Sequence, residues 1–166
     1  MAKKVFEKIK RGNAAQRIQI AKDVITWVKA GKVRVSASTG YVSRPLGNDT
    51  WFDGTAEPVD AREALCAVEG ACTVCARGAL LLAMVDRFDV LKIGALSDLG
   101  DEAGYTDGGY LDRLFSRDKE EIEAAFEGFA SNTKWVEAIP NASDRIIAIM
   151  RNIIRNKGRF KIDDVG

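Results

Sequence analysis

The chain contains no histidine, and only three of its 166 residues are cysteine and three are proline. Without histidine the sequence excludes Ser-His-Asp and Cys-His nucleophiles, histidine-ligated zinc, haem on a proximal histidine and the usual near-neutral acid or base. Few prolines, with 46% hydrophobic and 30% charged residues, are typical of a folded globular protein. We therefore predict a folded protein without a catalytic residue, a cofactor or a bound metal.

Long apolar segments and phosphate-binding loops are also missing. The longest apolar run, Ala79–Val85, falls far short of the ~20 residues that span a bilayer. The N-terminus alternates charged and apolar residues instead of showing a signal core. No G-x-x-x-x-G-K-[ST] loop occurs, and no G-x-G-x-x-G follows a predicted strand. These features predict a cytoplasmic protein with no membrane partner, and they argue against nucleotide binding through such loops.

The three cysteines cluster as Cys66, Cys72 and Cys75, and the last two have the C-x-x-C spacing. In a reducing compartment an odd number of cysteines favours free thiols. A structural zinc site needs four ligands, and a redox dithiol opens a helix after a strand, whereas no strand pattern precedes residue 72. We expect the cysteines to pack in the core, with redox and metal roles as alternatives.

Hydrophobic periodicity predicts a mainly α fold, of the α+β class with one small β-hairpin, in one compact helical domain over residues 1–166. Helices are expected over about 13–31, 58–70, 71–88, 110–115, 116–129 and 141–157, those near 71–88 and 141–157 forming the core. The predicted N-caps are Asn13, Ser116, and Asn141 or Ser143.

The remaining segments have other patterns. Residues 32–38 alternate with period two, which predicts a strand, and residues 40–43 could pair with it as a hairpin. Trp51 and Phe52 stand among turn-forming residues, where they either anchor a loop to the core or line a ligand pocket. Residues 1–12 are expected as a peripheral basic segment and residues 159–166 as a flexible tail.

The segment Cys75-Ala76-Arg77-Gly78-Ala79-Leu80, followed by Ala83, resembles the Cys-x-x-Gly-Ala-Leu-x-x-Ala helix of a family of small uncharacterised bacterial and phage proteins. The resemblance covers about residues 14–90, and Trp51 could match a tryptophan that precedes this helix in the family. Because the family has no established activity, the resemblance implies a fold relative and a phage context, but no mechanism.

Charge is sorted by position along the chain. Residues 1–44 carry a net charge of +9, residues 45–127 of −11 and residues 128–166 of +3. A total of +1 therefore hides basic ends around an acidic middle. Such asymmetry points either to an external partner or to internal docking of the two zones.

Two charged segments are the candidate partner-binding sites. The loop at 94–109 carries Asp98, Asp101, Glu102 and Asp107, whose carboxylates could also hold Ca²⁺ or Mg²⁺, although their spacing does not match an EF-hand. Beside and beyond the last helix lie Arg151, Arg155, Lys157 and Arg159, which either complement the helix dipole or form a basic surface for phosphates.

The sequence favours a non-enzymatic binding or accessory protein, in a phage or mobile-element setting, that acts on a macromolecular partner. A protein partner is expected, with nucleic acid and homo-oligomerisation as further possibilities. The first alternative is a small hydrolase that uses a divalent metal at residues 98–107. The second is a nucleic-acid-binding protein that uses its basic termini.

Overall fold

In the computed structural model of the chain, the described residues are 12–37, 42–43, 59–60, 73–88, 92–93, 110–129 and 131–166. This part of the chain is mostly helical, so the predicted mainly α fold is confirmed. Its helices are α2 (Ala14–Lys29), α4 (Ala76–Phe88), α6 (Tyr110–Phe115), α7 (Lys119–Glu127), α8 (Lys134–Ala138) and α9 (Ala142–Arg155).

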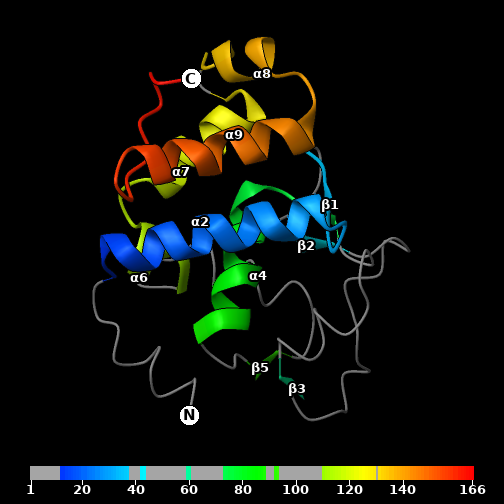
Figure 1. The fold of residues 1–166 in the computed structure, drawn as a ribbon. Coiled ribbons are helices and arrows are strands. Elements are labelled where there is room, and N and C mark those ends of the chain that lie inside the picture. The colour runs from blue at the N-terminus through cyan, green and yellow to red at the C-terminus, as the bar shows by residue number, and fades with distance from the viewer. Residues whose placement is uncertain are drawn as a thin grey trace.

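Helices α2 and α9 are distant in sequence and lie side by side (Figure 1). The first begins as predicted: Asn13 accepts a hydrogen bond from the Gln16 backbone, and the Gln16 side chain accepts one from the Asn13 N–H. Helix α9 begins at the predicted cap Asn141, and its apolar stripe of Ile146, Ile149, Met150 and Ile153 is fully buried. The two helices thus pair through faces that their periodicity predicts.

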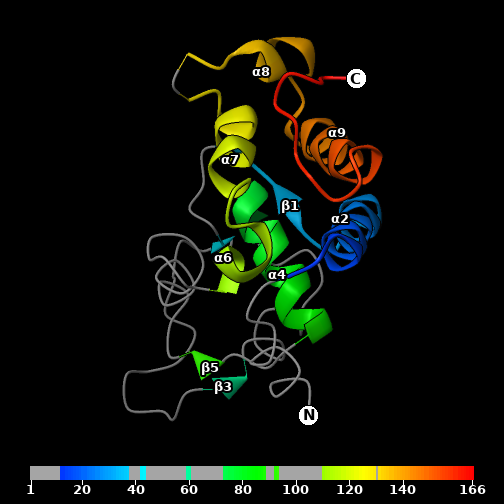
Figure 2. The same cartoon turned by 90° about the vertical axis from the view of Figure 1, so that its left-hand side faces the viewer.

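Helix α4 is the most buried element of the described structure, as predicted. Its residues from Ala76 to Met84 are all buried, and Leu80, Leu81 and Met84 have no exposed surface. It contacts α2 on one side and α6 and α7 on another (Figure 2). A helix that is apolar all round can only be accommodated between other elements, which explains its central place.

The predicted hairpin is wrong in its pairing. Strands β1 (Arg34–Val35) and β2 (Val42–Ser43) both form, but β4 (Thr73–Val74) lies between them, parallel to β1 and antiparallel to β2. Val74 is fully buried, so this central strand joins the sheet to the core. An alternating pattern predicts a strand and its buried face, but it does not indicate which other strand pairs with it.

Two predicted helices are corrected at their starts. Val59–Asp60 is strand β3, antiparallel to β5 (Lys92–Ile93), whereas a helix is predicted from residue 58. The helix predicted over 71–88 begins only at Ala76, because Thr73–Val74 is part of the sheet. Threonine and valine are β-branched and favour strands, and here sheet pairing outweighs the apolar run that suggested a longer helix.

Helix α7 is shorter than predicted. Its N-cap is Asp118 and not Ser116, which is exposed in the preceding turn. At the other end Gly128, at φ 80°, adopts the left-handed conformation that stops the helix. Phe129, predicted in the buried stripe, lies beyond this stop and is 54% exposed.

Residues 159–166, predicted as a flexible tail, instead pack against α8 and α9. The buried Asn152 donates hydrogen bonds from Nδ2 to the carbonyls of Lys161 and Asp164, and its Oδ1 accepts one from the Lys161 N–H. Phe160 is buried against Trp135 of α8, a helix that the sequence analysis does not predict. The indole N–H of Trp135 donates to the carbonyl of Ile162 at 2.7 Å.

Candidate arginine pocket

The candidate residues of the acidic loop, Asp98, Asp101, Glu102 and Asp107, lie outside the described residues, as do Trp51 and Phe52. The metal-dependent hydrolase that depends on that loop therefore stays a prediction. Within the described ranges no group of three or more histidine, cysteine or acidic side chains could hold a metal ion. No described helix is long and apolar enough to cross a bilayer.

The four basic candidates at the end of the chain fall into two kinds. Arg151 and Lys157 are exposed and make no ion pair with any described residue. Arg155 donates to Asp164 through Nε at 3.0 Å, and Arg159 donates to Asp118 through Nε and Nη2, both at 2.9 Å. All four are exposed, but internal ion pairs hold two of these cations and leave the other two without an ion pair to a described residue.

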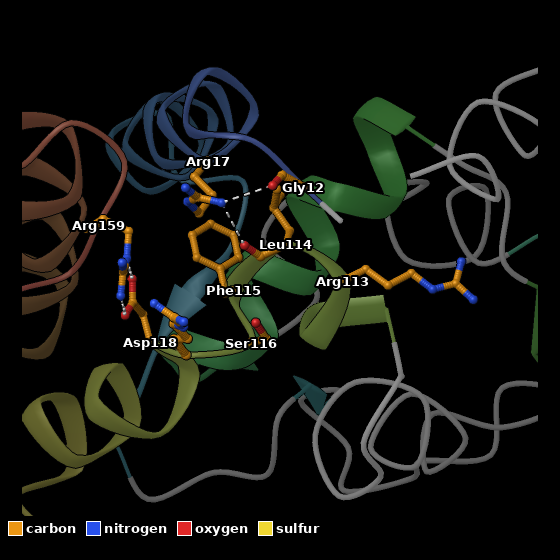
Figure 3. Close-up of a pocket in the computed structure, with 9 residues that line it drawn as sticks. Gly12, Arg17, Arg113, Leu114, Phe115, Ser116, Asp118 and Arg159 are labelled. Carbon is orange, nitrogen blue, oxygen red and sulfur yellow. Dashed lines mark hydrogen bonds and ion pairs between the residues drawn. The ribbon is translucent and has the colours of Figure 1, made fainter. Parts of the chain in front are cut away.

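Arg159 and Asp118 border a pocket of about 150 Å³. We call it the arginine pocket, and its walls are Gly12, Arg17, Arg113, Leu114, Phe115, Ser116, Arg117, Asp118 and Arg159. These residues come from the start of α2 and the residue before its cap, from the end of α6 and the turn that follows it, and from the segment after α9 (Figure 3). In Figure 3 the side chain of Arg113 points away from Arg17 and Arg159.

Arg17 joins the three segments that form the pocket. Its Nε donates to the carbonyl of Gly158 at 2.6 Å, and its Nη1 donates to the carbonyls of Gly12 at 3.3 Å and Leu114 at 3.5 Å. The Gly12 N–H also donates to the Arg113 carbonyl at 2.7 Å. The five N–H donors of a guanidinium point in different directions within one rigid plane, so a single arginine can bridge segments that are distant in sequence.

Among the described residues of the pocket wall, Asp118 is the one acidic side chain. It is buried, and besides the two hydrogen bonds from Arg159 it accepts one from the Phe160 N–H at 3.0 Å. Burial acts to raise the pKa of Asp118, but the hydrogen bonds from Arg159 and Phe160 and the charges of Arg159 and Arg17 outweigh it and lower that pKa. Asp118 is therefore an ionised anchor whose hydrogen-bonding capacity is largely used.

The pocket gathers more positive than negative charge. Of the described residues that line it, four are arginines and one is an aspartate. Burial and, after it, the charge of Arg159 lower the pKa of Arg17, while Asp118 acts in the opposite direction. Two guanidinium groups are thus close enough to repel each other, and a single carboxylate offsets part of that repulsion.

A second group of charges lies where α4, α7 and α9 meet. Arg77 of α4 pairs with Glu123 at 2.6 Å, and Arg145 of α9 donates to the carbonyls of Phe126, Ile139 and Pro140 at 2.8–3.0 Å. Arg145 is buried and so cannot belong to the basic surface of the last helix. Burial first, and the charge of Glu123 second, raise the pKa of Glu127 to about 7, with Arg145 opposing them.

Cys75 lies in the core, at the junction of β4 and α4, and Cys66 and Cys72 lie outside the described residues. Burial raises the pKa of the Cys75 thiol to about 11, although the backbone N–H groups of Gly78 and Arg77 act to lower it. A thiol that stays protonated is a poor nucleophile and a poor metal ligand. This environment agrees with the expected packing role of Cys75.

Sequence reasoning found Arg159 but missed Arg17, Arg117 and Asp118. Asp118 and Arg159 are separated by 41 residues, and Arg17 and Gly158 by 141. No periodicity or motif connects positions so far apart. The one available signal was the excess of lysine and arginine over acids in residues 1–44 and 128–166, which include Arg17 and Arg159 but not Arg117 or Asp118.

Comparison with known proteins adds no relative. No protein-family model, curated protein or solved structure matches the chain. The resemblance of the segment around Cys75 to small bacterial and phage proteins accordingly stays a proposal.

Proposed function

We propose that the chain is a non-enzymatic binding protein, an accessory factor of a phage or mobile element that acts in the cytoplasm and contacts a protein partner through its separated charges. The observation that carries this proposal is that, among the described residues, most ion pairs do not join the oppositely charged zones of the sequence. The resemblance of residues 75–83 to phage and bacterial proteins supports the phage setting.

Most ion pairs of the described residues join charges of the same zone. Two pairs connect different zones, Arg87 with Asp23 and Arg159 with Asp118. Four stay within one zone: Arg77 with Glu123, Lys119 with Asp112, Lys134 with Asp163, and Arg155 with Asp164. Among the described residues, internal docking of opposite zones would give many pairs of the first kind, so the pattern in this part of the chain favours an external partner.

The exposed charges also favour a partner that carries both signs. Arg151 and Lys157 are exposed at the end of α9, and Glu120 and Glu121 are exposed in the first turn of α7. Glu121 is close enough to act on the charge of Arg159. Duplex DNA presents a negative charge about every 1.7 Å and would be repelled by such acids. A protein surface can place opposite charges against both groups, which improves specificity and association rate.

The test is affinity capture from the lysate of the native host, at low and at moderate salt. The full-length chain is compared with the double variant Arg151→Glu/Lys157→Glu. The matched control is Lys22→Glu/Lys29→Glu, which reverses two exposed charges on α2. A protein captured by the wild type is then purified and titrated against all three chains.

We expect the purified partner to bind the wild type and the α2 control alike. The α9 double variant should bind it at least about tenfold more weakly, and moderate salt should weaken the wild-type complex. Equal binding by all three chains would contradict the proposal, and so would recovery of no protein at either salt concentration. Recovery that nuclease treatment abolishes would instead support the nucleic-acid alternative.

A further inference from the structure

We propose that the arginine pocket binds one tetrahedral oxyanion of the phosphate class, either inorganic phosphate or the phosphoryl group of a phosphate monoester. The inference concerns the isolated protein and does not depend on the proposed function. It rests on the balance of charge in the pocket, on the hydrogen-bond donors that are left over, and on the pocket volume.

The balance of charge favours an anion. Arg17, Arg117 and Arg159 line the pocket together with one acid, Asp118. Asp118 already accepts three hydrogen bonds, two of them from Arg159. Within the described part of the chain, the hydrogen-bond partners of Arg17 are neutral carbonyls, and no described carboxylate is bonded to this half-buried cation. An oxyanion between Arg17 and Arg159 would offset their mutual repulsion and provide the missing counter-charge.

The arginines keep donors that the protein itself does not use. Among the described residues, the Nη2 of Arg17 and the Nη1 of Arg159 make no hydrogen bond. Arg117 and Ser116 lie exposed on the pocket wall and add a third guanidinium and a hydroxyl. Guanidinium groups bind phosphate oxygens through paired, charge-assisted hydrogen bonds, and more than one of them can share a tetrahedral anion.

The fixed positions of these donors make the site preorganised. Arg17 is held by carbonyls of three separate segments, and Arg159 is held in a two-point pair with Asp118. Figure 3 shows Arg159 and Asp118 paired on one side of Phe115 and Arg17 beside its ring. Because both guanidinium groups are in place before a ligand arrives, binding costs less side-chain entropy than it would with free surface arginines.

The volume limits what can bind. A space of about 150 Å³ is about five times the ~30 Å³ that a molecule occupies in liquid water. It is smaller than the ~300–1,000 Å³ of pockets that enclose a drug-sized ligand. The pocket can hold one phosphate group with a few waters. It cannot enclose a whole nucleotide, so only the phosphoryl group of a larger ligand would enter.

The experiment measures the melting temperature of the full-length chain in a phosphate-free buffer. Inorganic phosphate is added from about 0.1 to about 10 mM, with sodium chloride at equal ionic strength as the reference, because a ligand of the folded state stabilises it by mass action. Phosphoserine is titrated in a second series. Broadening of the ³¹P resonance of phosphate on addition of protein gives a measure of binding that does not depend on unfolding.

Two variants test the pocket, each with a matched control. Arg159→Lys keeps the positive charge but loses the planar guanidinium, which can bind Asp118 and a ligand at the same time. Its control is Arg155→Lys, because Arg155 also pairs with an aspartate and is similarly exposed. Arg117→Gln removes an exposed wall arginine, and Arg151→Gln removes an exposed arginine outside the pocket. Arg117→Gln leaves the internal contacts of the fold intact and therefore remains informative if Arg159→Lys is unstable.

We expect phosphate to raise the melting temperature in proportion to the logarithm of its concentration. Arg159→Lys should weaken phosphate binding about tenfold or more, and Arg117→Gln about three- to tenfold, whereas both controls should bind like the wild type. If phosphoserine binds as tightly as phosphate, the site takes a phosphoryl group carried on another molecule; if phosphate alone binds, it is a site for the free anion. Absence of binding by both ligands, or equal weakening by pocket and control variants, would overturn the inference.

Discussion

Replacing Glu127 by glutamine should stabilise the protein at alkaline pH and should have little effect in mild acid. Glu127 is a half-buried carboxyl at the end of α7, one turn after Glu123 and within the field of Arg145 on α9. Glu123 is already paired with Arg77, while Glu127 makes no hydrogen bond or ion pair with a described residue. Ionised Glu127 is therefore desolvated and lies beside a like charge.

The size of the effect follows from the pKa of Glu127, which rises from its ordinary value of 4.5 to about 7. At ~1.4 kcal/mol per unit, this rise corresponds to an upper limit of about 3–4 kcal/mol. Solvent screening of a partly exposed group reduces it to about 1–2 kcal/mol. The folded state holds the proton more tightly than the unfolded state, so stability is lost as the pH rises from about 4.5 to about 7 and stays lower above that range.

The assay is thermal unfolding of wild type and Glu127→Gln at several pH values. At about pH 8 the variant should melt about 2–8 °C higher, given about 2–4 °C per kcal/mol for a chain of this size. Near pH 5 the gain should shrink to about a quarter of that value. Glu120→Gln, an exposed position of the same helix, is the control and should change stability by less than about 0.5 kcal/mol at either pH. A gain of equal size at both pH values would refute the reasoning, because it would not come from the ionisation of Glu127.

Three further substitutions test the packing around the arginine pocket and the C-terminal segment, each measured as the free energy of unfolding in urea. Gly158→Ala should lower the free energy of unfolding by about 2 kcal/mol or more, because residue 158 has φ 89° and a Cβ there would lie 2.9 Å from the backbone of Ala14. The control Gly31→Ala, at φ 72° with open space around it, should lower it by only about 1 kcal/mol. Equal costs would show that the contact with Ala14 is unimportant. Asn152→Ala removes three hydrogen bonds to the backbone of residues 161–164 and should cost about 3 kcal/mol, and a cost below about 1 kcal/mol would mean that this segment is not held by Asn152. Trp135→Phe loses the hydrogen bond to the Ile162 carbonyl and part of a buried ring, so it should cost about 1–3 kcal/mol, whereas an unchanged stability would contradict the contact.

The helices that were predicted correctly are those whose boundaries are encoded locally. Asn13 with Gln16 forms a capping box, and Asn141 caps α9 through the N–H of Asp144. Such caps lie within four residues of the groups they satisfy, so the sequence contains both partners. The buried stripes of α4 and α9 were likewise visible as apolar periodicity.

The errors occur where a distant segment competes with the local preference. Thr73–Val74 belongs to an apolar stretch that could have continued a helix, but strands on both sides take up its backbone hydrogen bonds. The last residues looked like a polar tail, yet Asn152, Trp135 and Asp118 bind their backbone. In each case the deciding partner lies elsewhere in the chain, where no local pattern can indicate it.

The residues of the arginine pocket were also predicted only in part from the sequence. The sequence showed that lysine and arginine accumulate at the two ends of the chain, and it identified Arg159 as a candidate. It could not show that Arg17, Arg117 and Asp118 share one pocket with Arg159, because that juxtaposition depends on packing α2 against α9 and on the turn before α7.

By itself, the sequence determined the helical class, the N-caps of α2 and α9, the buried faces of α2, α4 and α9, and the separation of charge along the chain. These properties follow from interactions within a few residues and from composition. Only the tertiary structure decided which charges remain exposed, where the central strand lies and how Arg17 meets Arg159. These features require residues far apart in the sequence to come together, which closes long loops at a cost in entropy. The burial of apolar faces offsets this cost, but it is non-directional, so many arrangements of the same helices could bury those faces.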